Sequence, residues 1–565
     1  MRVHTIQVSY GTVKQGQTMK IALCQIEPTI GDFAGNSQII TRYAEEALQQ
    51  GAELAVFPEM SLCGYPPMDL LDQPGFSEHN ERALRKLQHM LPPTLAVAVG
   101  HIGRNASGSG RALTNCISVI KAGAIIFSQE KTLLPTYDVF DEARYFEPAK
   151  ERRIFTYRGI HIGFAICEDV WYESVPIPGL HYTVDPAREL LDAGANIIIV
   201  PSASPYQLEK IETRINLCTK IARIGSIPVA YCNTSGANDS LIFDGCSFVI
   251  NAAGRLCELA PASPHVLVFD TTNLECQPSI NLPNRFEALE EALVTGIKSY
   301  MKKCGFTKAH LGLSGGIDSA LVALLAVKAV GKDNVTCITL PSRFSSEGSI
   351  TDSELLCNNL GIRLTKIPIE KPYTAFLDVL YPHFENTNFG LTEENLQARI
   401  RGVILMAWSN KYNSMLLTTG NKSELAVGYC TLYGDMSGAL APIGDLYKTT
   451  VYEFCEYLYK RDRLMPRAII DKVPSAELRS NQRDQDSLPP YPELDAILEL
   501  YIEKGHTMQE IIQKGYNPDT VMRVIKLTGY AEYKRRQAAP VLKVTSRAFG
   551  LGRRYPIART LHELL

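Results

Sequence analysis

Short apolar runs recur along the first half of the chain. They are rich in β-branched residues and end at Pro, Gly, Asn or Glu, as in KIALCQ (20–25), LAVAVG (95–100) and NIIIVP (196–201). Runs of this length between turn residues predict buried strands. Two stretches with helical spacing of apolar positions, at 37–52 and 211–226, separate some of these runs. The pattern predicts an α/β layered domain from Lys20 to about Asp270.

The second half begins with a break in this pattern. In the segment ECQPSINLPNR (275–285) the apolar residues follow neither the strand pattern nor the helix pattern, and we place a linker there. An amphipathic helix is predicted at 286–305, followed by the apolar strand AHLGL, the Gly-rich turn SGGIDS (314–319), a helix and the strand VTCITL. Strand, Gly-rich turn, helix and strand in this order predict a βαβ unit of a doubly wound parallel sheet, with the turn at the carboxyl end of its first strand.

Length and composition divide the chain and narrow its class. At 565 residues two large domains are expected, and we predict an extension at 1–18 that is disordered, one domain at 19–275 and another at 276–565. A net charge of −3 gives no global attraction to nucleic acid or anionic membranes. No apolar run approaches the length of a membrane span.

The cysteines bear on cofactors and location. Fourteen are scattered along the chain without a CxxC spacing, which argues against zinc ribbons, thioredoxin-like motifs and disulfide frameworks. Most are expected to be small buried side chains in a protein of the reducing cytoplasm. We expect no zinc, flavin or haem.

Three polar residues follow predicted strands in the first half: Glu59, Lys131 and Cys167. Strand ends of an α/β fold meet at one crevice. A thiol there can attack an amide carbonyl, a lysine cation can stabilise the thiolate and the oxyanion, and a carboxylate can act as general base. Each residue alone has a simpler explanation, because most cysteines fill cores and most strand-end charges are solvated.

The segments around these residues, FPEMSLCGYPPMDLL, KTLLPTYDVFDEARYF and ICEDVW, resemble the signature segments of the nitrilase-like amidase superfamily. The resemblance implies a four-layer αββα sandwich with a Glu-Lys-Cys triad. By position, Glu59 is the base, Lys131 the oxyanion-side cation and Cys167 the nucleophile, and Glu142 matches a second acidic residue that orients the lysine.

Three further segments, CGYPPMDL, SASPYQLEK and NTSGANDSLIFDG, resemble the glutaminase branch that is attached to NAD⁺ synthetases. That likeness implies that Tyr137, Ser204 and Lys210 contact glutamine and that Tyr65 lines its pocket. Turn formation beside Pro205 is the alternative role for Ser204 and Tyr206.

The SGGIDS turn has the chemistry of a phosphate site. Its glycines let backbone N–H groups approach an anion, and the following helix points its positive end at the same place. Ser314 and Ser319 can add hydroxyl donors, and Asp318 can hold Mg²⁺. The spacing is neither that of a Walker A loop nor that of a GxGxxG dinucleotide fingerprint.

In this setting SGGxDS resembles the N-type ATP pyrophosphatases, doubly wound adenine-nucleotide enzymes that adenylate a carboxylate or amide oxygen. The segment LTTGNKSELAVGYCTLYGDMSGALAPIGDLYKT, with ENLQARIRG, KVPSAEL, EYKRRQ and RRYPI, is similar to the NAD⁺ synthetases among them. The implied ATP residues are Gly312, Leu313, Ser314, Gly315, Gly316, Ile317, Asp318, Ser319, Thr419, Lys448 and Ser475. Asp318 and Glu424 are the implied Mg²⁺ ligands, and Asn395, Arg399, Glu424 and Lys534 the implied contacts of deamido-NAD⁺.

One departure and one alternative concern this half. Ammonia-only relatives tend to carry Lys and Asp where this chain has Leu432 and Ala439, so contacts to the nicotinate end are left unassigned. The basic run EYKRRQ, with Arg547, Arg553 and Arg554 nearby, is also compatible with a solvated helix face or a nucleic-acid patch.

Together the resemblances imply an enzyme that releases ammonia from glutamine in one domain and uses it with Mg·ATP in the other to amidate deamido-NAD⁺. They also imply a homo-oligomer, with no nucleic acid or membrane as partner. Three alternatives stay open: another amide-forming ligase with this loop, a nitrile- or carbamoyl-hydrolysing enzyme whose second half is a binding module, and an RNA-modifying enzyme, for which no added RNA or zinc domain is visible.

Overall fold

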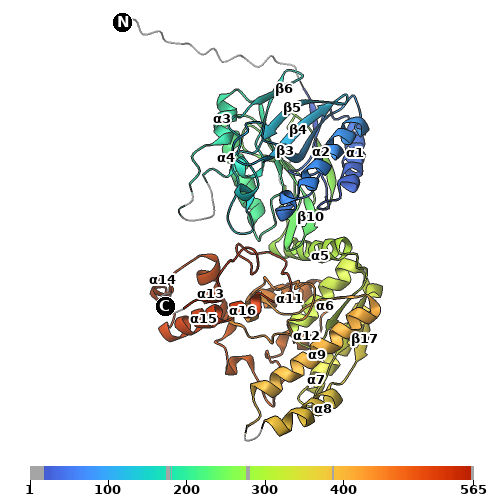
Figure 1. Ribbon diagram of the computed structural model, residues 1–565, viewed down its shortest axis with the longest axis vertical. Helices are drawn as coiled ribbons and strands as arrows, with labels where there is room; N and C mark the ends of the chain where they lie inside the picture. The colour runs from blue at the N-terminus through green and yellow to red at the C-terminus, as the bar shows by residue number, and fades with distance from the viewer. Residues whose placement is uncertain are drawn as a thin grey trace.

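The computed structural model describes residues 18–173, 179, 181–274, 276, 280–384 and 387–560. The predicted disordered extension at 1–18 lies outside this range except for its last residue. Two layered units follow one another along the chain, the first in the upper half of Figure 1 and the second in the lower half.

The first unit contains two six-stranded sheets. One has the order β14 (His265–Asp270), β1 (Lys20–Gln25), β2 (Leu54–Val56), β3 (Ala96–Arg104), β4 (Leu113–Lys121) and β5 (Ala124–Glu130). The other has the order β13 (Leu256–Leu259), β12 (Phe248–Ile250), β9 (Val229–Asn233), β8 (Ile197–Ser202), β7 (Ile160–Phe164) and β6 (Ile154–Tyr157). The central strands β1–β2–β3 and β7–β8–β9 are parallel, and the outer pairings are antiparallel.

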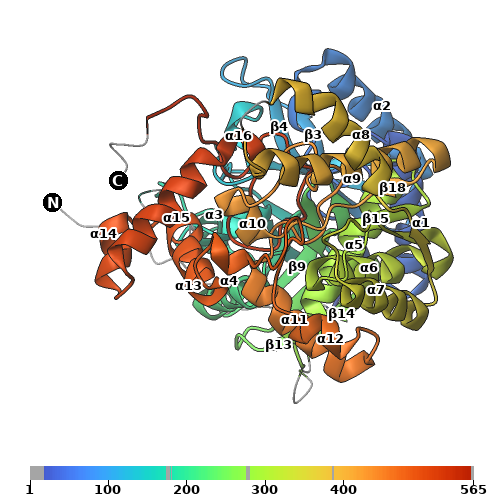
Figure 2. The same ribbon diagram turned by 90° about the horizontal axis from the view of Figure 1, so that it is seen from below.

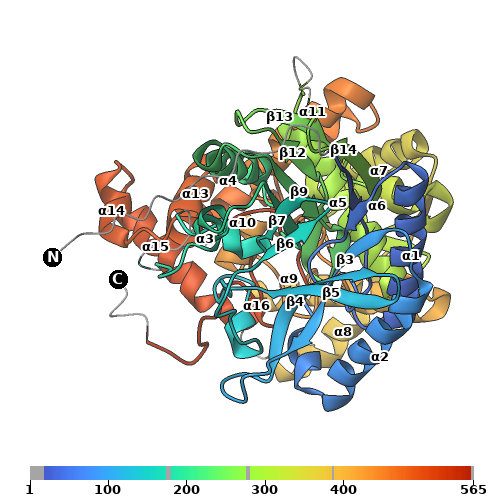
Figure 3. The ribbon, with the colours of Figure 1, turned by 90° about the horizontal axis from the view of Figure 1, so that it is seen from above.

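The two sheets face each other and carry helices on their outer faces. Leu23 and Val56 of the first sheet pack with Phe164 and Ile199 of the second in one buried core. Helices α1 (Phe33–Gln49) and α2 (Pro74–Met90) cover the first sheet, and α3 (Pro186–Asp192) and α4 (Lys210–Gly225) cover the second (Figure 3). The predicted αββα sandwich is therefore confirmed.

The remaining elements of this unit are short. They are the hairpin of β10 (Ser235–Asn238) and β11 (Leu241–Asp244) and the single turns η1 (Met68–Asp72), η2 (Glu142–Arg144) and η3 (Cys167–Val170).

The second unit is built on a four-stranded parallel sheet. Its order is β17 (Arg363–Lys366), β16 (Val335–Thr339), β15 (Ala309–Gly312) and β18 (Met415–Leu416). One face packs against α5 (Arg285–Lys303), α6 (Ile317–Val330), α7 (Glu347–Leu360), α11 (Lys448–Asp462) and α12 (Arg467–Asp471), and the other against α8 (Glu370–Leu380) and α9 (Leu391–Tyr412) (Figure 2). Helices on both faces of a parallel sheet confirm the predicted doubly wound arrangement.

A helical cluster completes the second unit. It contains α10 (Lys422–Val427), α13 (Tyr491–Leu498), η7 (Glu499–Glu503), α14 (Met508–Gln513), α15 (Pro518–Tyr530) and α16 (Glu532–Arg535), and the short turns η4 (Lys332–Asn334), η5 (Tyr381–His383) and η6 (Asp484–Asp486) lie elsewhere in the unit. Among the helices that the structure describes, none has both the length and the apolar character that a membrane crossing requires.

The two units meet along α5 and the β10–β11 hairpin, which lie side by side in Figure 1. Lys303 Nζ at the end of α5 donates to the carbonyl of Ala237, at 2.8 Å. The chain near the C-terminus returns to the first unit, where Lys543 N donates to Ser240 O at 2.8 Å and Leu208 N to Val544 O at 2.9 Å. A domain boundary between residues 275 and 276 stays a prediction.

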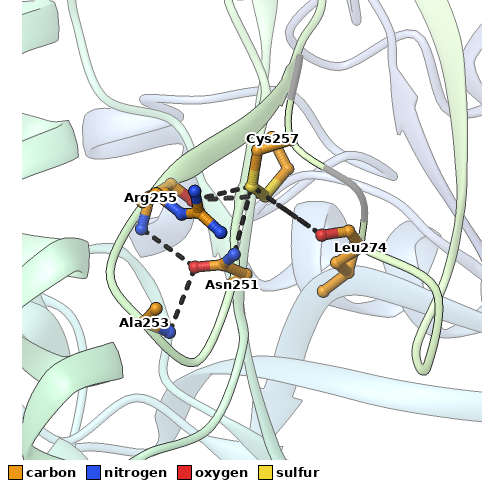
Figure 4. The surroundings of a disulfide bond; sticks show 6 residues. Asn251, Ala253, Arg255, Cys257 and Leu274 are labelled. Atoms are coloured by element: carbon orange, nitrogen blue, oxygen red, sulfur yellow. Dashed lines mark hydrogen bonds between the residues drawn. A yellow bond between two sulfur atoms is a disulfide. The ribbon is translucent and has the colours of Figure 1, made fainter. Parts of the chain in front are cut away.

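The cysteines depart from expectation at one pair. Cys257 of β13 and Cys276 form a disulfide with an S–S distance of 2.02 Å, next to Arg255 and Leu274 (Figure 4). The spacing argued against a disulfide framework, and this single bond was not predicted, because β13 and the chain leaving β14 bring together two cysteines that have no local signature. Of the twelve free cysteines, ten are buried, as expected.

Candidate functional site

The structure brings Glu59, Lys131 and Glu142 together in the first unit. Glu59 follows β2, Lys131 follows β5 directly, and Glu142 begins η2. Lys131 Nζ donates to Glu59 Oε1 at 2.7 Å and to Glu142 Oε1 at 2.8 Å. All three side chains are buried. A lysine between two carboxylates in a dry interior is held in one position and kept charged.

The pKa values in this cluster reflect its burial. Burial alone lowers the pKa of Lys131, but the carboxylates of Glu142 and Glu59 outweigh it and raise that pKa well above its ordinary value. Burial raises the pKa of Glu142 to about 7, although Lys131 opposes this change. Tyr65 OH donates to Glu142 Oε1 at 2.8 Å, so Tyr65 faces this cluster.

Glu59 is fixed from two further sides. Asn115 Nδ2, on β4, donates to its Oε1 at 2.6 Å, and the backbone N–H of Ala203 donates to its Oε2 at 3.0 Å. Sequence reasoning missed both partners. Asn115 lies inside an apolar strand and Ala203 contributes only its backbone, so neither has a signal in the sequence.

Cys167 begins η3 in a left-handed conformation with φ of 47°. A residue other than glycine is uncommon there and is held by its surroundings. Asp169 provides this restraint, because its carboxylate accepts from Ile166 N at 3.0 Å and from Leu133 N at 2.7 Å. The turn that presents the thiol is thereby tied to the strand end that presents Lys131.

The thiol of Cys167 is electrostatically close to the cluster. Burial and the carboxylate of Glu59 raise its pKa well above the ordinary value, and the Lys131 cation opposes them. The thiol is therefore neutral at rest and requires a base to become a nucleophile.

Beside the thiol lies a second carboxylate that sequence reasoning did not assign. Glu168 Oε1 accepts from Tyr137 OH at 2.8 Å and from Tyr182 OH at 2.9 Å. Glu168 directly follows Cys167 in the ICEDVW segment, and this adjacency could have identified it. Tyr182 stands in a segment without a motif and could not have been found.

Two further predicted residues lie in the same region. Lys210 begins α4, its Nζ lies 5.5 Å from the centre of the Trp171 ring, and burial lowers its pKa to about 8. Ser204 is buried, and its backbone N–H donates to Asn233 Oδ1 at 3.0 Å. This contact joins residues 29 positions apart and is not a local turn bond, so both roles of Ser204 stay predictions.

The Gly-rich turn of the second unit lies between β15 and α6, as predicted. Ser319 Oγ donates to Gly316 O at 3.0 Å, and Gly316 N donates to Ser314 Oγ at 3.2 Å, so the two serines brace the turn. Gly315 has φ of +78°, and a Cβ on it would lie 2.3 Å from Ser349 O. Only glycine fits this position. Gly312 ends β15, Leu313 is buried, and Ile317 begins α6.

Next to the turn, the structure places two carboxylates around one lysine. Lys448 Nζ forms an ion pair with Asp318 Oδ2 and lies 3.5 Å from Glu424 Oε1. Burial raises the pKa of Glu424 to about 8, with Lys448 opposing and Asp318 adding to the rise. Asn421 Nδ2, which the sequence analysis missed, donates to Asp318 Oδ1 at 3.1 Å.

These carboxylates suit a hard cation only in part. Carboxylate oxygens are preferred Mg²⁺ ligands, and Mg²⁺ at phosphate sites commonly takes one or two of them and completes its shell with phosphate oxygens and water. Within the described ranges no group of three or more His, Cys, Asp or Glu could hold a metal ion. Asp318 and Glu424, on either side of Lys448, are the two carboxylates that this site can offer a cation.

Three of the residues predicted to contact deamido-NAD⁺ form hydrogen bonds with the segment that follows α10. Lys534 Nζ donates to Gly428 O at 2.8 Å and to Cys430 O at 2.7 Å. Asn395 Oδ1 accepts from Thr431 Oγ1 at 2.8 Å, and Arg399 Nε donates to Leu432 O at 3.3 Å.

The last two predicted ATP residues differ in setting. Thr419 is partly buried between β18 and α10. Ser475 is exposed, and its Oγ accepts from Glu477 N at 3.2 Å. The same segment reaches the Gly-rich turn through Lys472, a residue that the sequence analysis missed, whose Nζ donates to Gly315 O at 3.3 Å.

The basic run EYKRRQ is not a solvated patch throughout. Arg535 is buried, and its guanidinium donates to Ala426 O at 2.7 Å and to Glu532 Oε2 at 2.8 Å. Arg553 is also buried and donates to the same Glu532 oxygen at 3.0 Å. Guanidinium groups engaged in this way inside the protein do not present a phosphate-binding surface.

Comparison with known proteins assigns a family to each half of the chain. A carbon-nitrogen hydrolase family model matches residues 20–273, and an NAD synthase family model matches residues 289–538. The glutamine-dependent NAD(+) synthetase of Synechocystis sp. is 46% identical over 96% of this chain and 99% of its own. That of Xanthomonas campestris is 41% identical over 96% and 97%. The chain belongs to the glutamine-dependent NAD(+) synthetase family.

Solved structures of the family support the same assignment. The glutamine-dependent NAD⁺ synthetase of Acinetobacter baumannii, solved with adenosine diphosphate, superposes with a TM-score of 0.76 at 35% identity, covering 96% of this chain and 98% of the other. The Cytophaga hutchinsonii synthetase gives a TM-score of 0.80 at 20% identity over the same shares, which supports the fold. Both units of this chain therefore have a counterpart in a single chain of the Acinetobacter baumannii synthetase.

Proposed function

We propose that the protein is an ATP-dependent ligase that hydrolyses glutamine to ammonia in its first unit and uses this ammonia in its second to amidate deamido-NAD⁺, with release of AMP and pyrophosphate. One observation carries the proposal: a buried Glu59–Lys131 pair beside a buried thiol stands in the same chain as a Gly-rich turn flanked by carboxylates. The first arrangement suits amide hydrolysis and the second nucleotide activation.

In the first step Glu59 takes the proton of the Cys167 thiol as the sulfur attacks the glutamine side-chain carbonyl. Lys131 stabilises the oxyanion, and Glu59 returns the proton to the departing ammonia. Water then attacks the γ-glutamyl thioester, again with Glu59 as base, and releases glutamate and the thiol. The contacts of Glu142 with Lys131 and Tyr65 give it a positioning role.

Glutamine is proposed to bind beside Cys167 through Tyr137, Ser204 and Lys210, with Tyr65 at the inner wall. The α-carboxylate of glutamine would pair with the Lys210 cation. Burial lowers the pKa of Lys210 to about 8, which leaves the cation predominant at neutral pH, and a bound carboxylate would raise that pKa.

In the second unit the backbone N–H groups of Ser314–Ser319 and the start of α6 would hold the phosphates of ATP. Thr419, Lys448 and Ser475 are proposed to assist. A Mg²⁺ ion on Asp318 and Glu424 would neutralise phosphate charge while the nicotinate carboxylate is adenylated. Asn395, Arg399, Glu424 and Lys534 are the proposed contacts of deamido-NAD⁺.

The carboxylate that accepts the ammonia distinguishes the proposed enzyme from another amide-forming ligase. The purified protein should convert deamido-NAD⁺, Mg·ATP and glutamine to NAD⁺, AMP, pyrophosphate and glutamate in equal amounts, as measured by chromatography. Release of ADP and phosphate, or turnover only with a different carboxylate, would contradict it.

A homo-oligomer and a cytoplasmic location are also proposed. The oligomer is supported by the exposed apolar side chains of α8, η5 and α9 and their connection: Phe376, Val379, Tyr381, Phe389, Leu391 and Val403. Contiguous exposed apolar residues mark association surfaces. The location is supported by the number of free thiols.

Glu142→Gln should remove a pH dependence from glutamine hydrolysis. Burial raises the pKa of Glu142 to about 7, so its carboxylate becomes protonated as the pH falls through that value. The neutral carboxyl group no longer forms an ion pair with Lys131. Wild-type kcat/KM for glutamine should therefore fall below pH 7. At pH 8 the kcat/KM of the variant for glutamine should be about 10- to 100-fold below that of the wild type, because removing an oriented charge from an active site costs on this scale. The kcat/KM of the variant should show no further fall below pH 7.

The measurement is glutamate release between pH 5.5 and 9. Tyr65→Phe serves as the matched variant, since it removes one hydrogen bond to Glu142 and leaves the titrating group. An unchanged acidic limb in Glu142→Gln would assign the limb to another group.

Gly315→Ala should block use of ATP. The methyl group would meet Ser349 O at 2.3 Å, so the turn must move away from its phosphate-binding conformation. NAD⁺ formation should fall by about 100-fold or more with glutamine or ammonia, as for other displaced oxyanion-binding backbone groups.

Gly305→Ala is a close control, because Gly305 has the same φ of +78° with nothing within 4 Å of a Cβ. Its conformational strain costs about 1 kcal/mol, so activity should persist. Equal losses in both variants, with equal thermal midpoints, would show that strain and not the clash is responsible.

A further inference from the structure

The β10–β11 hairpin belongs to the first unit and packs against α5 of the second (Figure 1). Successive strand residues point to opposite faces, and this hairpin uses both. On one face Ile242 shares a buried apolar cluster with Leu293 of α5. On the other, the Phe243 ring meets the Tyr65 ring edge-on, with the ring centroids 6.5 Å apart. The hairpin therefore connects α5 with Tyr65, whose hydroxyl donates to Glu142 at 2.8 Å.

Lys303, the last residue of α5, fastens the second unit to this hairpin. Its Nζ donates to Ala237 O and to Asn238 Oδ1, each at 2.8 Å, and to Pro28 O at 3.1 Å. It also lies 3.3 Å from Glu27 Oε1, and the lysine side chain is only 15% exposed. An ammonium group has three N–H donors, so these oxygens hold it in one position. A single lysine of the second unit therefore fixes the end of β10.

Asn238 passes this restraint on to Tyr65. The residue is buried and uses both ends of its amide, because Oδ1 accepts from Lys303 and Nδ2 donates to Tyr65 O at 2.8 Å. The amide has one possible orientation here, since a lysine can only donate and a backbone carbonyl can only accept. A series of three hydrogen bonds thus links Lys303 to Glu142 through Asn238 and Tyr65.

We propose that Lys303 is a positioning residue for glutamine hydrolysis. Through Asn238 it holds Tyr65 against Glu142, which in turn holds Lys131, so these side chains are fully ordered only while the second unit is docked on the hairpin. This inference rests on the proposed function and identifies a residue of one unit that controls the reaction in the other.

Lys303→Met should slow glutamine hydrolysis without weakening glutamine binding. Methionine keeps an unbranched chain and removes the three donors. The kcat for glutamine hydrolysis should fall by about 5- to 20-fold, the scale on which residues along a packed network alter a distant site. The KM for glutamine should change by less than about threefold, and NAD⁺ formation from ammonium chloride by less than about twofold, because Lys303 contacts neither substrate site.

The pH profile gives a second readout, which general destabilisation would not produce. Burial raises the pKa of Glu142 to about 7, and Glu59 adds to the rise. Lys131 and Tyr65 oppose it, so a weaker hydrogen bond from Tyr65 raises the pKa of Glu142 further. In Lys303→Met the acidic limb of kcat/KM for glutamine should therefore move about half a pH unit higher. Tyr65→Phe should move it in the same direction.

Asn238→Asp separates the hydrogen-bond series from the junction itself. Its carboxylate still accepts from Lys303 but has no N–H for Tyr65 O. This variant should therefore show the kcat loss and the pH shift of Lys303→Met while the ion pair at the junction is kept. Combining the two changes should lower kcat by no more than about twofold below the slower single variant, because both interrupt one series.

Lys302→Met is the control, since Lys302 is the exposed neighbour of Lys303 in the last turn of α5, and it should behave as the wild type. Glutamate release, ammonia-supported NAD⁺ formation and the thermal midpoint are measured on the full chain. A wild-type kcat and pH profile in Lys303→Met, or losses that multiply in the double variant, would overturn the proposal. If Lys303→Met fails to fold, Asn238→Asp decides, and a wild-type profile there overturns it. A wild-type protein that releases no glutamate would instead contradict the proposed function.

Discussion

Replacing Cys167 with serine should reduce glutamine-supported NAD⁺ formation by about 1000-fold or more, while added ammonium chloride still supports it. The serine hydroxyl is a far weaker nucleophile, and the charges of Glu59 and Lys131 both act on the Cys167 thiol. The second unit has its own proposed nucleotide site, with Asp318 and Lys448 on separate elements. Only the supply of nitrogen should be lost.

The assay compares NAD⁺ formation from glutamine and from ammonia, with glutamate release followed in parallel. Cys304→Ser is the control, because Cys304 is an exposed thiol at the end of α5. Loss of both activities in Cys167→Ser, with an unchanged thermal midpoint, would contradict separate sites. Full glutaminase activity would exclude Cys167 as nucleophile.

Asp318→Asn should reduce NAD⁺ formation from both nitrogen sources by about 1000-fold or more, because the Asp318 side chain serves both the proposed metal ion and Lys448. Its carboxylate is the proposed metal ligand, and it pairs with Lys448. The amide would remove the ligand and leave the buried lysine with Glu424 alone. Glutamine hydrolysis at Cys167 should continue.

AMP, pyrophosphate and glutamate are measured together for this variant. Asp333→Asn, at an exposed position of η4, controls for the loss of one charge. If Asp318→Asn makes NAD⁺ from ammonia at more than a few per cent of the wild-type rate, the proposed phosphate and metal site is wrong. If glutamate release also stops, the two units are more tightly coupled than separate sites allow.

The sequence predicted most of the architecture because the necessary signals are local. Runs of β-branched residues predicted β1, β8 and β9, and the order of strand, Gly-rich turn and helix predicted the βαβ unit of β15, α6 and β16. Gly315 could be placed in a phosphate-type turn because only glycine adopts its backbone conformation. Such features need only a few consecutive residues.

The candidate catalytic residues were also accessible, for a different reason. Glu59, Lys131 and Cys167 each follow a strand, and strand ends of one fold share an edge. The structure brings Glu59, Lys131 and Glu142 into direct contact and places Cys167 within their electrostatic reach. Their catalytic roles remain predictions.

The tertiary structure alone decided which distant groups hold these residues in place. Asn115 reaches Glu59 from another strand, Tyr182 reaches Glu168 from a segment without a motif, and Lys472 reaches the Gly-rich turn from beyond α12. The Cys257–Cys276 disulfide has the same origin. One sequence specifies what each segment can form, but the pairing of segments depends on how their apolar faces pack, and that packing is settled only when the whole chain folds.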